Sequence, residues 1–527
     1  MGATSLARRK KMLQKVATTG ADLDSAYTQT LQRIRDQKGD RSRLGIEVLM
    51  WVSHAERPLG IDELRYALAV EMGSTDLDPD NIPPQDTVLG SCLGLAVVDA
   101  ETSTVRLIHY TLQEYLSSPG IMPDAHKTLG QTCLTYLNYK QVKELPAKKI
   151  LTFEDMPFLQ YSSLHWGSHA KVELPDRAKS LALEPLNQAG NHISATLLVE
   201  QISALLVKRV GYPHSFSLPY HLWPALHCAS YFGIIEVVTA LMERGGCDIN
   251  QNDCMGFAPF IHAAWQGDEG VVQLLLTWDD INLDKPDNNG GTPLWWASYY
   301  AHVGVVKLLL ARDDINPDKP DKGGQTPLWW VSFHGYEGVA KLLLARDDVN
   351  PDKPNNDGVT PLWRASSIRH EGMAKLLLTR DDINPNKPNS DGETPLWWAS
   401  SNEHEWLVKL LLARNDVNPN KPDMRGVTPL AQACNRGHEG IVKLLLKRDD
   451  INPNMNMPQY PDQTPLLWAS FDGHPGIVKL LLAHKDLDPN SIYEAYQMLT
   501  RLSLHKEVAE LLKPRAASVS RLISKNK

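Results

Sequence analysis

The segment GGTPLWWASYY, residues 290–300, recurs in the next repeat as GGQTPLWWVSFH, residues 323–334. The proline of this segment returns every 34 residues, at Pro259, Pro293, Pro327, Pro361, Pro395 and Pro429. Ala225 holds the same place 34 residues before Pro259, and Pro465 follows Pro429 after 36 residues. A period of this length predicts a solenoid of stacked repeats.

Each repeat contains the signals for a turn and two helices. Thr292 is a good N-cap, and Pro293 fits the first position of a helix. The preceding stretch 287–290, Asp-Asn-Asn-Gly, has the composition of a tight turn. A strongly apolar stretch with Val305, Val306 and three leucines at 308–310 predicts a second helix.

Turn, short helix and longer helix together resemble the ankyrin repeat, whose pattern is D-x-x-G-x-T-P-L-H-x-A-A-x-x-G-H followed by V-V-x-L-L-L. The resemblance covers about residues 222–490 in eight repeats. The segment EAYQMLTRLSLHKEVAELL, residues 494–512, resembles the degenerate capping repeat that such stacks need. The expected fold class is mainly α, with a helical and winged-helix N-terminal region followed by an ankyrin-repeat solenoid.

The paired tryptophans are nearly constant from repeat to repeat. Trp295 is matched by Trp329, Trp363 and Trp397, and Trp296 is matched by Trp330, Trp398 and Trp468. This constancy predicts a structural ladder in which each indole stacks on the same neighbour one repeat away. The family has histidine where Trp295 stands, and its histidine network cannot be carried over because indole donates one hydrogen bond and accepts none.

The two positions after Ala-Ser vary, and in the first four repeats they are mostly aromatic. In ankyrin proteins these positions usually face the concave groove and touch the partner. The resemblance therefore implies a protein partner bound on the concave face. The predicted partner-binding residues are Tyr231, Phe232, Trp265, Tyr299, Tyr300, Phe333 and His334. An equally weighted alternative is that these rings are buried and extend the tryptophan ladder.

The N-terminal half shows no such period. Helices are expected at 25–37, 43–55, 60–70 and 111–116, with a hairpin of two short strands between the last two, which predicts a winged-helix unit. The segments at 94–116, 133–138 and 158–170 resemble the region between the NACHT domain and the ankyrin array of fungal NLR-like receptors. The winged-helix part resembles that of GPI inositol-deacylase-like proteins. His109 is expected to pack at the base of the hairpin.

These observations predict six parts of the chain. A basic segment at 1–21 precedes a helical and winged-helix domain at 22–130 and a helical linker at 131–215. The ankyrin-repeat domain at 216–490, a capping repeat at 491–513 and a basic tail at 514–527 follow.

No G-x-x-x-x-G-K-[ST] motif occurs, so the phosphate-binding loop of a NACHT ATPase is missing. We therefore expect a non-enzymatic interaction module, the recognition or regulatory part of a NACHT/NLR-like signalling protein. The alternative is a fragment of a signal-transduction NTPase receptor whose nucleotide-binding domain is missing from this chain. No catalytic residue, cofactor or small-molecule substrate is predicted.

Charge and cysteine usage narrow the partners further. The net charge of −8 becomes about −18 without the ten basic side chains of residues 1–15 and 513–527, so nucleic acid is not an expected partner. No apolar stretch is long enough for a membrane span. Six cysteines without a CxxC pair are typical of a reduced, intracellular protein, and we expect the cytoplasm, although RRKK at 8–11 leaves the nucleus open.

Metal sites are not expected. Paired aspartates recur in the repeat loops, as at 313–314 and 347–348, and a weak calcium site is the alternative to solvated loop acids. Cys247 and Cys254 stand seven residues apart without a second ligand pair, which disfavours zinc.

Overall fold

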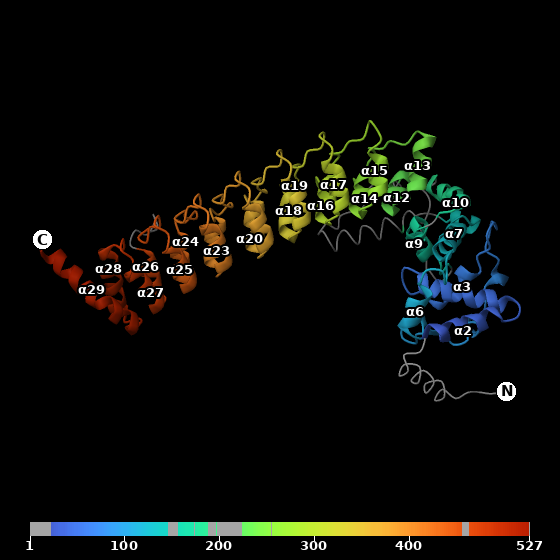
Figure 1. Cartoon of the computed structure of the whole chain (residues 1–527), viewed down its shortest axis with the longest axis horizontal. Coiled ribbons are helices and arrows are strands. Elements are labelled where there is room, and N and C mark those ends of the chain that lie inside the picture. The colour runs from blue at the N-terminus through green and yellow to red at the C-terminus, as the bar shows by residue number, and fades with distance from the viewer. Residues whose placement is uncertain are drawn as a thin grey trace, which may run out of the picture. The chain divides into compact units, whose positions relative to one another are not determined.

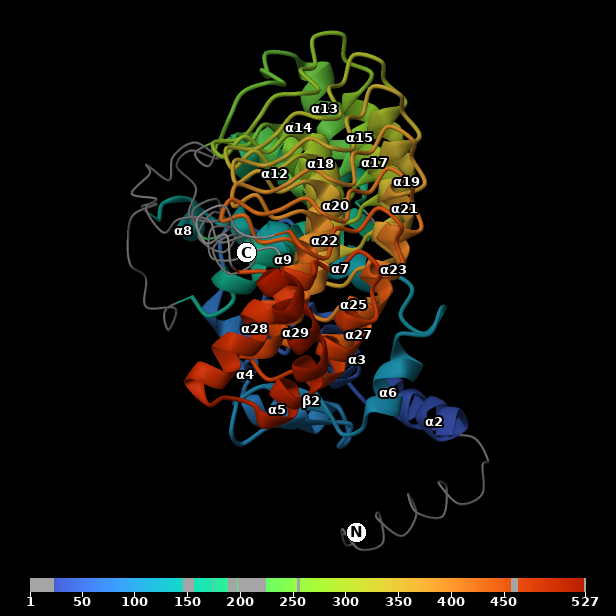
Figure 2. The same cartoon turned by 90° about the vertical axis from the view of Figure 1, so that its left-hand side faces the viewer.

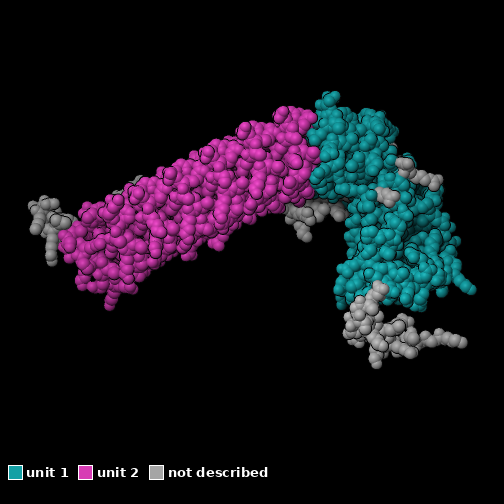
Figure 3. All heavy atoms as spheres, in the orientation of Figure 1, with its two compact units in different colours: residues 1–281 teal, residues 282–527 magenta. Residues whose placement is uncertain are grey.

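The computed structural model describes residues 23–145, 156–172, 174–187, 197, 224–253, 256–455 and 463–525. The chain divides into two compact units, residues 1–281 and residues 282–527 (Figure 3). We call them unit 1 and unit 2 and describe each by itself. The expected basic segment at 1–21 and most of the expected linker after residue 187 lie outside the described residues.

Unit 1 begins with helices packed around a small hairpin. The elements are α2 (Leu23–Arg35), α3 (Asp40–His54), α4 (Ile61–Leu68), the 3₁₀ helix η1 (Pro79–Asn81), α5 (Gln85–Ser91), β1 (Ala96–Val98), β2 (Val105–Leu107) and α6 (Tyr110–Leu116) (Figure 1). Strands β1 and β2 pair antiparallel, with Val97 opposite Arg106. Glu63 stabilises the start of α4 because its Oε2 accepts from the Gly60 N–H at 2.8 Å.

The expectation for His109 is wrong. Its side chain is exposed and does not pack under the hairpin. Instead, His109 caps α6, and its Nδ1 accepts a hydrogen bond from the backbone N–H of Thr111 at 3.2 Å. A helix start needs an acceptor for its free N–H groups, and this imidazole supplies one.

A second layer of unit 1 is formed by α7 (Ala125–Leu137), α8 (Lys140–Lys143), α9 (Leu159–Val172) and α10 (Asp176–Asn187). Aromatic rings join this layer to α3. The ring of Trp51 lies edge-on to Phe158 at 5.4 Å and to Tyr161 at 5.8 Å, and Tyr136 lies edge-on to Phe158 at 5.2 Å. Edge-to-face pairs of this kind stabilise by about 0.5–1.5 kcal/mol beyond their burial.

Two helix pairs complete the described part of unit 1. They are α12 (Ala225–Phe232) with α13 (Ile235–Arg244), and α14 (Pro259–Gln266) with α15 (Glu269–Leu275). These are repeats one and two of the predicted series. Repeat one is anchored to the helical layer because Phe232 packs against Trp166 with ring centroids 5.0 Å apart.

Unit 2 continues the series with repeats three to eight. The pairs are α16 (Pro293–Tyr299) with α17 (Val303–Leu310), α18 (Pro327–His334) with α19 (Glu337–Leu344), α20 (Pro361–Ser367) with α21 (Glu371–Leu377), α22 (Pro395–Ser401) with α23 (Glu405–Leu412), α24 (Pro429–Arg436) with α25 (Glu439–Leu445), and α26 (Pro465–Phe471) with α27 (Pro475–Leu482). The first helices α18, α20 and α22 form one column, and the second helices α19, α21 and α23 form a column beside it (Figure 2).

The caps that the sequence predicts are present. The Oγ1 atom of Thr292 accepts from the N–H of Trp295 at 3.1 Å, and the equivalent threonines of the later repeats do the same. Histidines at the starts of second helices tie neighbouring repeats together. The Nε2 of His370 bonds to the carbonyl oxygen of Phe333 at 3.0 Å, so its role is structural.

The loops between repeats form a second ladder of polar contacts. Arg414 pairs with Asp416 at 2.8 Å, and its Nη1 also donates to the carbonyl oxygens of Leu378 and Arg380 in the preceding repeat. The equivalent pairs are Arg312–Asp314, Arg346–Asp348, Arg380–Asp382 and Arg448–Asp450. In the aspartate pairs at 313–314, 347–348, 381–382 and 449–450, the second aspartate therefore lies beside a guanidinium, which does not favour a calcium site.

Unit 2 ends with α28 (Pro489–Leu502) and α29 (Lys506–Lys525), where the sequence predicts a capping repeat. Helix α29 contains Pro514 and runs through the residues on both sides of the expected boundary at 513/514. None of the helices in the described ranges is long and apolar enough to cross a membrane.

Candidate functional site

Four of the predicted partner-binding residues lie together in unit 2. Tyr299, Tyr300, Phe333 and His334 are half-buried and in ring contact, and we call them the aromatic surface. The ring centroids of Tyr299 and His334 are 4.9 Å apart, those of Phe333 and His334 are 4.8 Å apart, and those of Tyr299 and Tyr300 are 5.1 Å apart. Repeats three and four thus present one continuous cluster of rings.

The other three predicted residues lie in unit 1 and differ in exposure. Tyr231 is half-buried, whereas Phe232 and Trp265 are each only 6% exposed. Phe232 packs against Trp166, and Trp265 lies 5.8 Å from the ring of Tyr231. For Phe232 and Trp265 the alternative of burial in the stack therefore holds, and they offer no ring to a partner.

The rings of the aromatic surface pack against buried tryptophans. Tyr299 stacks on Trp295 at 5.2 Å, and Phe333 stacks on Trp329 at 6.1 Å. The predicted contacts between indoles of neighbouring repeats are present, as where Trp363 stacks on Trp398 at 5.9 Å. Trp295 contacts Trp330 at 5.5 Å, so the first indole of one repeat meets the second indole of the next.

Hydrogen bonds hold these indoles in place. The Nε1 of Trp329 donates to the carbonyl oxygen of Val359 at 3.0 Å, in the loop of the following repeat. Trp363 and Trp397 donate to Glu393 and Val427 in the same way. The family's histidine network is thus replaced by indoles that act as donors toward the next repeat. A rigid base of this kind reduces the entropy that the aromatic surface would lose on binding.

A loop carboxylate fixes the second indole in repeats three and four. The Oδ1 of Asp321 accepts from the N–H groups of Gly323 at 3.0 Å and Gln325 at 2.9 Å, which closes the turn. Its Oδ2 accepts from Nε1 of Trp330 and from Nε1 of Trp295, each at 3.1 Å. Burial raises the pKa of Asp321, and the indole and backbone donors oppose that shift.

Arg364 is a candidate that the sequence interpretation missed. It stands in repeat five where Trp296 and Trp330 stand in repeats three and four. Its Cζ lies 4.4 Å from the centroid of the Phe333 ring and 5.3 Å from that of Trp329. Arg364 therefore extends the aromatic surface into repeat five with a positive charge. Burial lowers the pKa of its half-buried guanidinium.

The environment of His334 in the aromatic surface favours its uncharged form. Burial lowers the pKa of His334, and the nearby His370 lowers it further. The pKa of Tyr299 is raised by burial and by its tyrosine neighbours. The guanidinium of Arg364 is therefore the charged group beside the tyrosine, phenylalanine and histidine rings. The surface combines apolar contact area with one cation.

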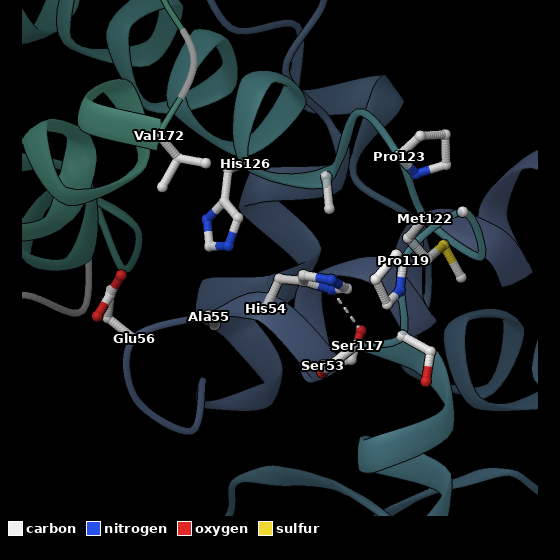
Figure 4. Close-up of a pocket in the computed structure, with 13 residues that line it drawn as sticks. Ser53, His54, Ala55, Glu56, Ser117, Pro119, Met122, Pro123, His126 and Val172 are labelled. Atoms are coloured by element: carbon white, nitrogen blue, oxygen red, sulfur yellow. Dashed lines mark hydrogen bonds between the residues drawn. The ribbon is translucent and has the colours of Figure 1, made fainter.

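A second candidate is a cavity of about 670 Å³ in unit 1 (Figure 4). His54 and His126 line it, with perpendicular rings 5.5 Å apart. Behind them, Nδ1 of His126 lies 2.9 Å from Nδ1 of His169, whose Nε2 lies 2.9 Å from the hydroxyl of Tyr161. The Tyr161 hydroxyl in turn accepts from the N–H of Glu56 at 3.1 Å.

The hydrogen-bonded histidines behind this cavity are part of the packed interior, with His169 fully buried and His126 half-buried. Burial lowers the pKa of His54, and it lowers that of His169 to about 3. Hydrogen bonds of His169 with His126 and Tyr161 therefore join α7 to α9, and the ring contact of His54 with His126 joins α3 to α7. Within the described ranges, no group of histidine, cysteine, aspartate or glutamate side chains could hold a metal ion. Cys247 is a free thiol, and Cys254 lies outside the described residues.

Comparisons with known proteins agree with the architecture. A family model described as ankyrin repeats (3 copies) matches residues 199–287, 260–354, 347–423 and 407–493, which together span more than half of the chain. A model described as the GPI inositol-deacylase winged helix domain matches residues 34–125. The predicted resemblance, fold class and order of the two parts are thereby confirmed.

Among solved structures, the ankyrin repeat domain of Bcl-3, a unique member of the IkappaB protein family, is similar over 42% of this chain and 96% of that chain. The sequence identity is 23% and the TM-score is 0.39. No curated protein matches the chain.

Proposed function

The chain belongs to the ankyrin-repeat proteins, and from that premise we propose that it binds a protein partner through the aromatic surface of repeats three and four. Ankyrin repeats indicate a protein–protein interaction module, and the fold is typically non-enzymatic. The finer proposal concerns which side chains make the contact, and it rests on the cluster of Tyr299, Tyr300, Phe333 and His334.

One observation carries the proposal. Four rings from two successive repeats touch one another while remaining partly open to solvent. The energy of protein interfaces is concentrated in a few aromatic and arginine side chains that fill pockets near the centre of the contact. The equivalent positions in repeats five and six hold Ser367, Ile368, Ser401 and Asn402, so the rings are confined to one stretch of the repeat series.

The face and the biological setting are part of the same proposal. We place the partner on the concave face because the rings belong to the first helices α16 and α18. The order of winged helix and repeats supports a role as the recognition or regulatory part of a NACHT/NLR-like signalling protein. We propose the cytoplasm as its compartment from the cysteine usage of the sequence.

The test uses the full chain and two variants as bait in a quantitative affinity capture from cells of the source organism. One variant combines Tyr299→Ala with Phe333→Ala. The matched control is Phe471→Ala, which removes a 45% exposed ring from the position equivalent to Phe333 in repeat eight. Far-UV circular dichroism on all three proteins reports whether each is folded.

We expect proteins that the wild type and Phe471→Ala retain equally, and that the double variant loses by about tenfold or more. If all three baits retain the same proteins, the aromatic surface is not the contact. If the double variant is unfolded, the rings are needed for the stack, and the proposed role of Tyr299 and Phe333 is wrong.

A further inference from the structure

A bond between a loop acceptor and a first-helix donor recurs in the early repeats. The two residues are always nine positions apart. Asp287 Oδ2 accepts from Trp296 Nε1 at 2.8 Å, and Asp321 Oδ2 accepts from Trp330 Nε1 at 3.1 Å. In repeat two, Asp253 Oδ2 lies 2.7 Å from His262 Nε2. We call this contact the loop–helix bond.

Repeats five and six replace the loop aspartate by asparagine, at Asn355 and Asn389. The asparagine keeps the turn, because Asn355 Oδ1 accepts from the N–H groups of Asp357 at 3.1 Å and Val359 at 2.9 Å. Its other terminal atom is an amide nitrogen, which donates and cannot accept. The loop–helix bond is therefore chemically impossible in these two repeats.

The donors that would have used this bond are left without an acceptor. The Nε of Arg364 and the Nε1 of Trp398 are both buried and have no hydrogen-bond partner among the described residues. A buried donor without an acceptor destabilises the fold, and the cost is higher for a charged group. Repeat five therefore retains an unpaired guanidinium that repeats three and four would have satisfied internally.

Arg364 also differs from the other arginines that lie over aromatic rings in the described part of the chain. Arg57 lies over Tyr161 and donates to Glu63 at 2.8 Å, and Arg425 lies over Trp397 and donates to Asp423 at 2.8 Å. Arg364 lies over Phe333 without forming an ion pair with any described carboxylate. Stacking on a ring orients a guanidinium and leaves its N–H donors available for a carboxylate in the plane of the guanidinium.

We propose that Arg364 receives a carboxylate of the protein partner, so that an acidic segment of that partner lies over repeats four and five with its Asp or Glu at Arg364 and an apolar side chain against Phe333. This inference rests on the proposed function and specifies the chemistry of the partner. The partner's carboxylate bonds the terminal nitrogens of the Arg364 guanidinium, because Nε is itself buried.

Charge and geometry favour this occupant over a nucleic acid. A guanidinium matches a carboxylate with two parallel hydrogen bonds, and the neighbouring repeats already use carboxylates at this position. A single arginine in a chain of net charge −8 gives little attraction to a phosphate backbone. A phosphate ligand is therefore an outcome of the test.

The experiment selects binders to the full-length chain from a random-peptide display library, with the Tyr299→Ala/Phe333→Ala variant as counter-selection. Dissociation constants of the enriched peptides are then measured against the wild type, Arg364→Met, Asn355→Asp and Asn389→Asp. Asn355→Asp supplies an internal acceptor to Arg364. Asn389→Asp adds the same charge one repeat further along and is the matched control.

We expect the enriched peptides to contain more Asp and Glu than the starting library. Arg364→Met and Asn355→Asp should each weaken them by about tenfold, whereas Asn389→Asp should change their affinity by less than about threefold. Asn355→Asp should also raise the melting temperature, because Arg364 gains a partner in the free protein. That stabilisation separates loss of the free guanidinium from loss of folding.

Each other outcome refutes a defined statement. Enriched peptides without acidic residues, or ones that bind Arg364→Met as tightly as the wild type, would refute the carboxylate at Arg364 and leave the proposed function standing. Absence of any peptide that distinguishes the wild type from the counter-selection variant would refute both. Binding of a single-stranded oligonucleotide that Arg364→Met abolishes would replace the acidic segment by a phosphate ligand.

Discussion

Replacing Asp321 by asparagine removes an acceptor from two indoles and keeps the turn that the same side chain closes. An asparagine Oδ1 can hold the amides of Gly323 and Gln325, as Asn355 does in the next repeat. The Nε1 atoms of Trp295 and Trp330 both lose Oδ2, and each buried donor without an acceptor costs about 1–3 kcal/mol.

Part of that cost is recovered. Burial raises the pKa of Asp321, which means that the ionised carboxylate is less stable in the fold than in water, and a neutral amide removes that penalty. The substitution therefore leaves two indole N–H groups without an acceptor and removes one buried carboxylate charge. We therefore expect Asp321→Asn to lower the free energy of local unfolding by about 1–3 kcal/mol.

Hydrogen exchange followed by mass spectrometry measures this local opening without assuming that unit 2 unfolds in one step. Peptides from α16 and α18 should exchange about tenfold faster for each 1.4 kcal/mol that is lost. Asp391→Asn, which removes an exposed loop charge, is the matched control and should leave these peptides unchanged.

The pH dependence gives a second check with a defined sign. Because the folded pKa of Asp321 lies above its unfolded value of 3.8, its contribution to stability is full below that value and is lost as the pH rises through the folded pKa. The difference between wild type and Asp321→Asn should therefore be larger near pH 3.8 than at pH 7. Equal exchange in both proteins at both pH values would refute the role of the carboxylate.

Three further predictions test the rest of the fold. Unit 1 should lose stability as the pH falls from 6.5 towards 3, by up to about 1.4 kcal/mol per pH unit, because burial lowers the pKa of His169 to about 3. In His169→Gln, the urea concentration at the midpoint of unfolding should depend less on pH than in the wild type. Gly167→Ala places a Cβ against the ring of Phe232 and should cost about 1–3 kcal/mol by thermal unfolding, with partial recovery when Phe232→Leu is added. Arg414→Met removes the pair with Asp416 and two bonds to the preceding repeat, and should lower the free energy of unfolding of unit 2 by about 1–2 kcal/mol in urea titrations.

Helix positions were predictable because the signals are local. A threonine before a proline fixes the start of each first helix, and the Thr292 cap is present where expected. The exposure of the candidate site residues was not predictable, because Phe232 and the half-buried Tyr300 occupy the same position in their repeats. Phe232 is buried since Trp166 and Gly167 of α9 lie against it, and those residues are distant in sequence.

Arg364 was missed although the sequence contains a signal for it. The repeat position that holds Trp296, Trp330 and Trp398 holds arginine in repeat five, at Arg364. The loop position nine residues earlier changes from aspartate in repeats three and four to asparagine in repeats five and six. Together, the two repeat positions indicate a donor without its acceptor. Either position alone shows only a substitution in a repeat.

The repeat, its period, the caps and the order of winged helix and solenoid could be predicted from the amino-acid sequence alone. These follow from hydrogen bonds and apolar spacing within about one turn or one repeat, which the chain specifies locally. The three-dimensional packing sets which rings stay accessible, which indoles meet, and which buried donors lack an acceptor. Those properties depend on side chains from neighbouring repeats and from α9, because burial and hydrogen-bond satisfaction are set by whatever packs against a residue in space.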